Sequence, residues 1–117
     1  MEVKELLLKQ IETHDYTSFA ELEKCMERAN IDYKGDMCWH LDNYPNPILW
    51  SGWKIEFFRA INDLLREKKI DIHHDNTCGM CYIIDGRLLQ LPAAKKMVQY
   101  KEPHWLPITF SKRGVTE

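Results

Sequence analysis

The sequence predicts a single α+β domain in which an N-terminal helical hairpin and a central helix pack on a small antiparallel sheet. Apolar residues recur at helical spacings of three and four over 2–14, 18–30 and 52–67. Between 70 and 91 they instead form short strand-like runs, two of which are joined by the Asp-Gly pair at 85–86. The length of 117 residues is that of one domain, and 44% hydrophobic with 29% charged residues is typical of globular proteins.

Two helices are predicted at the N-terminus. The second begins at Ser18, because Ser18 and Glu21 have the spacing of a capping box, in which the serine oxygen accepts a bond from a free backbone amide. Asn30 and Gly35 are typical of the end of a helix. Each helix has one apolar face, so we expect the two to pack as a hairpin. These faces consist of Val3, Leu6, Leu7 and Ile11, and of Leu22, Cys25, Met26 and Ala29.

A strand, a loop and the central helix are predicted next. Apolar and polar residues alternate over 36–41, which indicates a half-buried strand. The segment 42–47 holds two prolines and two asparagines, which predicts a loop. Ser51 is a suitable N-cap for the central helix, since its hydroxyl can accept a bond from a free helix amide. The predicted apolar face of this helix consists of Trp53, Phe57, Phe58, Ile61, Leu64 and Leu65.

Three short strands are predicted after the central helix, over 70–73, 80–84 and 87–91. The first is separated from the second by a polar turn at 75–79. The Asp-Gly pair at 85–86 favours a type I′ hairpin turn, because both central residues of that turn have positive φ. The order predicts an antiparallel meander.

The C-terminal third is predicted to contain a short helix, a loop and a final strand. Pro92 suits the first turn of a helix over 92–100. Prolines flank the segment 104–106, which predicts a loop anchored by its aromatic residue. Residues 108–112 are predicted to form an edge strand.

Charge is distributed unevenly along the chain, although the formal net charge is only −2. Residues 1–51 carry ten acidic and five basic side chains, whereas residues 86–117 carry two acidic and six basic ones. A basic face can bind nucleic acid even when the whole protein is slightly acidic. The chain begins with charged residues and has no long apolar run, so we expect no signal peptide, no membrane partner and a cytoplasmic location with reduced thiols.

Cys78 and Cys81 have the spacing of half a zinc site or of a redox pair. Adjacent strand residues point to opposite faces, so only one of two neighbouring histidines could complete such a site. The favoured alternative places Cys81 in the core and Cys78 in a turn, with no metal and no cofactor. The chain has no phosphate-binding Gly-rich loop and no hydrolase or metalloprotease motif, so an enzyme is the less favoured class. The other potential ligands are Cys25, Cys38, His40, His73 and His74.

Trp50 and Trp105 lie near prolines in predicted loops. Tryptophan at such a position either fills the edge of the core or anchors a protein partner. We favour the core for both, and retain both as candidate partner-binding residues. Trp53 is expected in the core.

Ala60, Leu64, Leu65 and Ile70 follow the rhythm Ala-x-x-x-Leu-Leu-x-x-x-x-Ile, with a turn and a second strand after it. This pattern resembles the recognition helix and wing of winged helix-turn-helix proteins, and it is also similar to small bacterial and phage proteins. The resemblance covers about a third of the chain and implies a module that binds nucleic acid or protein. The turn at 75–79 holds no base, which favours protein binding over operator recognition.

The sequence therefore predicts a non-enzymatic, winged-helix-like binding module that acts through protein contacts or self-association. One alternative is a regulatory protein that binds nucleic acid with the basic C-terminal third. The other is a zinc- or cysteine-dependent enzyme that uses Cys78, Cys81 and His73. The candidate nucleic-acid contacts are Lys95, Lys96, Lys101, Lys112 and Arg113.

Overall fold

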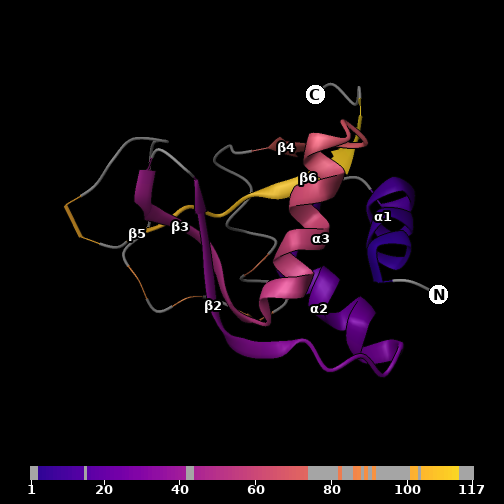
Figure 1. The fold of residues 1–117 in the computed structure, drawn as a ribbon, viewed down its shortest axis with the longest axis horizontal. Coiled ribbons are helices and arrows are strands. Elements are labelled where there is room, and N and C mark those ends of the chain that lie inside the picture. Colours follow the sequence, from indigo (N-terminus) through magenta and orange to yellow (C-terminus); the bar gives the residue numbers. More distant parts are fainter. Residues whose placement is uncertain are drawn as a thin grey trace.

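Three helices and two small sheets make up the described part of the chain, which confirms the α+β class (Figure 1). The computed structural model describes residues 3–14, 16–41, 44–73, 82, 86, 87, 89, 91, 101, 102 and 104–113, with the backbone alone at 41 and 44–47. Among these residues, no helix is long and apolar enough to cross a membrane.

The N-terminal helices are α1 (Val3–Thr13) and α2 (Phe19–Arg28). The Ser18 hydroxyl accepts a hydrogen bond of 3.1 Å from the Glu21 amide, so the predicted N-cap is confirmed. The two helices contact each other as expected, and α1 also contacts α3 (Ile55–Arg66). The short strand β1 (Thr17–Ser18) lies between α1 and α2 in the chain.

The ends of α2 and α3 share one backbone motif. At α2, Asn30 has φ of 58°, and the Ile31 amide donates to the Met26 carbonyl at 2.9 Å. At α3, Lys68 has φ of 59°, and the Lys69 amide donates to the Leu64 carbonyl at 3.0 Å. This is the Schellman arrangement, in which a residue with positive φ closes the last turn of the helix. The predicted stop at Asn30 is therefore confirmed.

The hairpin of β2 (Lys34–Leu41) and β3 (Tyr44–Trp53) confirms one prediction and corrects two. The strand predicted over 36–41 is β2. The loop predicted over 42–47 is wrong from residue 44 onward, because that segment pairs antiparallel with β2. A proline removes only its own N–H, so a strand tolerates it where no partner needs that bond. Ser51 is consequently a strand residue, and α3 begins at Ile55 with Lys54 as its N-cap.

A third strand, β5 (His104–Trp105), pairs parallel with β3 and completes the sheet β2-β3-β5. The segment 104–106 was predicted to be a loop, so this assignment is also corrected. The Leu106 amide donates to the Ile48 carbonyl at 2.9 Å, which continues the contact past the end of β5. Trp53 is fully buried as predicted, although it reaches the core from β3 and not from the central helix.

The second sheet has the order β1-β6-β4. The strand β4 (Ile70–His73) lies where the sequence predicts it, but its described neighbour is β6 (Thr109–Lys112). The final strand is therefore central, with β1 on its other side, and not the edge strand that was expected. Each of its two faces contributes to the interior, since Thr109, Phe110 and Ser111 are all buried.

The predicted meander over 70–91 is corrected where the structure describes it. Tyr82 lies in a helical turn, and Arg87, Leu89 and Leu91 lie outside any strand. Gly86 has φ of +70°, a conformation that favours glycine. The remainder of this prediction, together with the helix over 92–100, falls outside the described residues.

The core is an aromatic cluster centred on Phe19. Its ring lies with centroids 5.2 to 6.3 Å from five other aromatic rings, which come from β2, β3, α3 and β6. The Tyr82 hydroxyl, which is fully buried, donates to the Ile108 carbonyl at 2.7 Å and accepts from the Phe19 amide at 3.1 Å. One cluster thus joins both sheets and two helices. The five partner rings are Trp39, Trp50, Trp53, Phe58 and Phe110.

Candidate functional site

An apolar surface lies where β2 meets the start of α3. Met37 and Ile55 are the large hydrophobic side chains that are exposed among the described residues, at 41% and 42% of their maximum area. Met37 pairs with Trp53, two residues before Ile55, so both lie at the same end of the β2–β3 hairpin. Their exposure costs free energy in water and is typical of a contact surface.

Trp39 lines a hollow with Ile55 and also contacts the core. Its half-buried ring stacks on Phe58 with centroids 6.0 Å apart and on Phe110 with centroids 6.5 Å apart. These contacts fix the orientation of the indole, so little side-chain entropy remains to be lost when a partner covers it. Rigid aromatic rings of this kind are frequent at the centres of protein interfaces.

Arg59 and Asn62 add polar groups to the same surface. They share a helix face with Ile55, at spacings of four and seven residues. A hollow of about 150 Å³ lies between Trp39 and this face of α3. Both polar side chains are exposed, and within the described residues Arg59 forms no ion pair. We call this region the β2–α3 surface; its residues are Met37, Trp39, Ile55, Phe58, Arg59 and Asn62.

A group of polar residues outside this surface holds elements of the fold together. Glu23 Oε2 accepts hydrogen bonds from Trp50 Nε1 at 2.9 Å and from Trp53 Nε1 at 2.8 Å. Glu23 Oε1 accepts from Arg87 at 2.9 Å, and the same guanidinium donates two bonds of 3.0 Å to Glu27. These bonds attach α2 to β3 and to the segment around Arg87.

Charges in this group shift pKa values in opposite directions. Hydrogen bonds from Arg87 and from Tyr33 lower the pKa of Glu27 to about 2. Burial and the hydrogen bond to Glu27 raise the pKa of Tyr33 above its ordinary value. Because the folded pKa of Glu27 is depressed, its contribution to stability is present above about pH 4.5 and is lost as the pH falls toward 2. At neutral pH Glu27 is therefore ionised and the Tyr33 hydroxyl keeps its proton, so their hydrogen bond stabilises the fold there.

The two tryptophans that were candidate partner-binding residues lie inside the protein. Trp50 and Trp105 are 3% and 6% exposed, and their ring centroids lie 6.0 Å apart. The indole N–H of Trp105 is buried without an acceptor in the part of the chain that the structure describes. Little of either ring is available at the surface.

The predicted nucleic-acid residues are only partly described. Lys101, Lys112 and Arg113 are exposed, whereas Lys95 and Lys96 fall outside the described residues. Pairing of β6 with β4 brings Lys68 and Lys69 to the same end of the molecule as Lys112 and Arg113. The Arg113 amide donates to the Lys69 carbonyl at 3.2 Å. Acidic side chains interrupt this end: Asp71 lies 3.6 Å from Arg113, and Glu67 lies 3.5 Å from Lys69.

The candidate zinc ligands are also only partly described. Cys78 and Cys81 fall outside the described residues, so this prediction stays a prediction. His73 is half-buried, and its Nε2 lies 2.5 Å from Ser111 Oγ, which engages that nitrogen. Within the described ranges, no three His, Cys, Asp or Glu side chains are grouped closely enough to hold a metal ion.

No protein-family model matches this sequence, and neither the curated proteins nor the solved structures give a significant match. Sequence reasoning missed the β2–α3 surface because it assigned Met37 and Trp39 to a buried strand face. One signal was present: Ile55 is an apolar residue in the polar stripe that continues through Arg59 and Asn62.

Proposed function

We propose that the protein is a non-enzymatic binding module whose β2–α3 surface docks a protein partner. The partner is expected to present an apolar side chain next to a carboxylate. The apolar group would cover Ile55 and the Trp39 ring, and the carboxylate would pair with Arg59.

The observation that carries this proposal is the hollow in which exposed Ile55 lies next to half-buried Trp39 and Arg59. Met37, the other exposed large hydrophobic residue that the structure describes, lies at the same end of the β2–β3 hairpin. Tryptophan, methionine and arginine are enriched at protein interfaces. The winged-helix resemblance implies a binding module as well. It remains a prediction, because most of its expected wing lies outside the described residues.

Site-specific crosslinking tests the proposal. A photo-crosslinking amino acid placed at position 55 of the full chain is expected to form one major adduct with another protein in the native cells. Mass spectrometry should locate the adduct in a segment where an apolar residue neighbours Asp or Glu. Adding Arg59→Glu should reduce the yield at least about tenfold, because it replaces an attraction with a repulsion between like charges.

Two matched variants serve as controls. The same crosslinker at position 68, which is exposed at the other end of α3, should give no such adduct. Arg66→Glu should leave the yield from position 55 unchanged, because Arg66 lies outside the surface. Equal yields from positions 55 and 68, resistance to Arg59→Glu, or an adduct with a second copy of this chain would contradict the proposal.

Nucleic-acid binding is a second candidate, favoured by the basic groups that β4 and β6 bring together. Lys68 and Lys112 are exposed there, whereas Lys69 and Arg113 form ion pairs with Glu67 and Asp71. The interleaved carboxylates would repel phosphate, which is why this candidate ranks below protein docking.

A salt titration tests this second candidate. If the basic end binds duplex DNA, the affinity should fall steeply between 50 and 200 mM salt, and Lys112→Gln should reduce the slope of log K against log salt by about one. Fluorescence anisotropy with a labelled duplex of arbitrary sequence measures both quantities. Absence of binding at 50 mM salt would rule this candidate out.

A further inference from the structure

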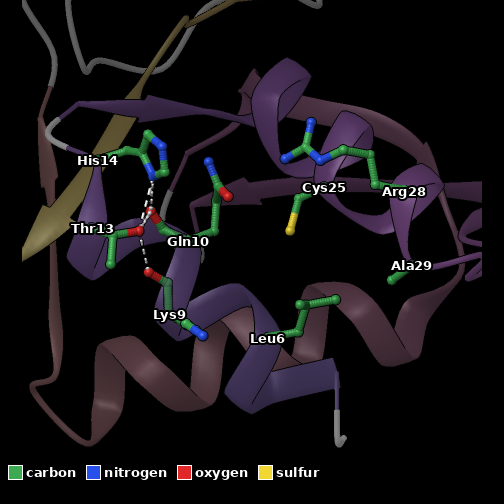
Figure 2. Close-up of a pocket in the computed structure, with 8 residues that line it drawn as sticks. All are labelled: Leu6, Lys9, Gln10, Thr13, His14, Cys25, Arg28 and Ala29. Atoms are coloured by element: carbon green, nitrogen blue, oxygen red, sulfur yellow. Dashed lines mark hydrogen bonds between the residues drawn. The ribbon is translucent and has the colours of Figure 1, made fainter.

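A pocket of about 370 Å³ lies between α1 and α2, lined by residues that the β2–α3 surface does not share (Figure 2). Its volume lies within the range of small-molecule sites. Leu6, Cys25 and Ala29 give it an apolar lining. Figure 2 shows the Cys25 side chain pointing from α2 into the space between the helices, opposite Leu6 of α1.

The charged groups at this pocket are all basic. Lys9 from α1 and Arg28 from α2 line it, and no Asp or Glu is among its lining residues. Both bases are exposed, and neither forms an ion pair with a described residue. An adjoining hollow of about 190 Å³ shares Arg28 and adds Lys24 together with one acid, Glu21. The potential in the pocket is therefore positive, which favours an anion.

Hydrogen-bond donors converge on the same space. The guanidinium of Arg28 can bind two oxygens of a carboxylate or phosphate at once. Gln10 contributes a side-chain amide, and in Figure 2 this amide lies between His14 and Arg28. The His14 ring is held in place, because its Nδ1 lies 3.1 Å from the Gln10 carbonyl and 2.9 Å from Thr13 Oγ1.

Cys25 contributes contact area and not a nucleophile. Its side chain is buried, and burial raises the pKa of the thiol although Arg28 opposes the shift. A neutral thiol is a weak nucleophile that packs as a small apolar group. The pocket thus combines basic donors with an unreactive apolar lining, which suits binding and not covalent chemistry.

We propose that this pocket binds a small organic anion, whose carboxylate or phosphate pairs with Arg28 while its apolar body lies against the Cys25 side, and Lys9 adds positive charge at the edge of the pocket. Both oxyanions have the chemistry that the Arg28 guanidinium recognises. The ligand needs an apolar body because the rest of the pocket lining, between the two helices, carries no charge.

Titrations followed by NMR of the ¹⁵N-labelled full chain test this inference, with phenyl phosphate, benzoate, inorganic phosphate and benzyl alcohol as probes. Phenyl phosphate or benzoate should bind more tightly than inorganic phosphate, which lacks the apolar body, and than benzyl alcohol, which lacks the charge. The amide shifts should concentrate on α1 and α2. The tighter of the two aromatic anions identifies the oxyanion that the pocket prefers.

Matched variants separate pocket binding from general attraction of anions. Arg28→Gln should weaken the better probe by about tenfold, which is typical for loss of one charged hydrogen bond. Lys9→Gln should weaken it to a smaller extent, because it removes only charge at the edge of the pocket. Arg66→Gln removes an exposed arginine that lies outside both this pocket and the β2–α3 surface, and it should leave the affinity unchanged. Cys25→Met should prevent the aromatic ring of phenyl phosphate or benzoate from entering the pocket, whereas inorganic phosphate should still bind.

Three results would overturn the inference. One is absence of binding by every anionic probe at 10 mM. Another is equal binding of benzyl alcohol and phenyl phosphate, which would show that charge is not recognised. The third is an equal loss in Arg28→Gln and Arg66→Gln, which would show that binding is not confined to the pocket.

Discussion

Glu23→Ala is expected to lower the free energy of unfolding by about 3 kcal/mol. The Glu23 side chain is only 12% exposed, and one of its oxygens accepts hydrogen bonds from both Trp50 and Trp53. Removing the carboxylate leaves two indole N–H groups in the interior without an acceptor, and each unsatisfied donor costs about 1–3 kcal/mol. Urea denaturation followed by tryptophan fluorescence measures the change.

Glu27→Ala is the matched control for this prediction, since it lies one helical turn away and also pairs with Arg87. Its side chain is 43% exposed, so water can replace the lost bonds, and we expect a loss of less than about 1 kcal/mol. The loss of stability from Glu23→Gln should lie between those from Glu23→Ala and Glu27→Ala, because the glutamine side-chain oxygen can still accept hydrogen bonds from the indoles. A loss from Glu27→Ala as large as that from Glu23→Ala would contradict the prediction.

Phe19→Ala is expected to cost about 4 kcal/mol of the free energy of unfolding. Phe19 is fully buried at the start of α2, and its ring contacts aromatic side chains from both sheets and from α3. The substitution removes these contacts and opens a cavity that the two sheets cannot close without separating from their helices. Urea denaturation gives the magnitude, and near-ultraviolet circular dichroism should lose intensity as the surrounding tryptophans become mobile.

Phe19→Leu separates volume from ring geometry. Leucine fills most of the space, so the loss should fall to about 1.5 kcal/mol. The backbone amide of residue 19 keeps its hydrogen bond to Tyr82 in both variants, so the difference between them reports on packing. A cost below about 2 kcal/mol for Phe19→Ala would show that the cluster is not the centre of the core.

Elements that depend on local contacts match the prediction made from the sequence. The start of α2 depends on Ser18 and Glu21, three residues apart, and its end depends on Asn30, which closes the last turn. The strand β4 follows directly from α3, and its alternation is visible over four residues. At both ends of α2 the interacting groups lie within about one helical turn, so the sequence contains the whole interaction. The partner of β4 is distant, but the alternation that predicts this strand is local.

Elements that depend on distant partners differ from the prediction made from the sequence. The prolines at 45 and 47 favour a loop when they are considered alone, but pairing with β2 extends the segment into β3 and moves the start of α3 from Ser51 to Ile55. The donors to Glu23 come from residues 27, 30 and 64 positions away in the chain. No spacing in the sequence links these groups.

The sequence alone determined the α+β class, the ends of α2, the strand β4 and the burial of Trp53. Only the tertiary structure decided that β6 lies between β1 and β4, and that Met37 and Ile55 are exposed at the same end of the β2–β3 hairpin. The burial of Trp50 and Trp105 confirms the core position that the sequence favoured. Local elements follow from backbone conformation and hydrogen bonds between near neighbours. Strand order and surface composition depend instead on which of several distant apolar and hydrogen-bonding partners excludes water best, and that competition involves the whole chain.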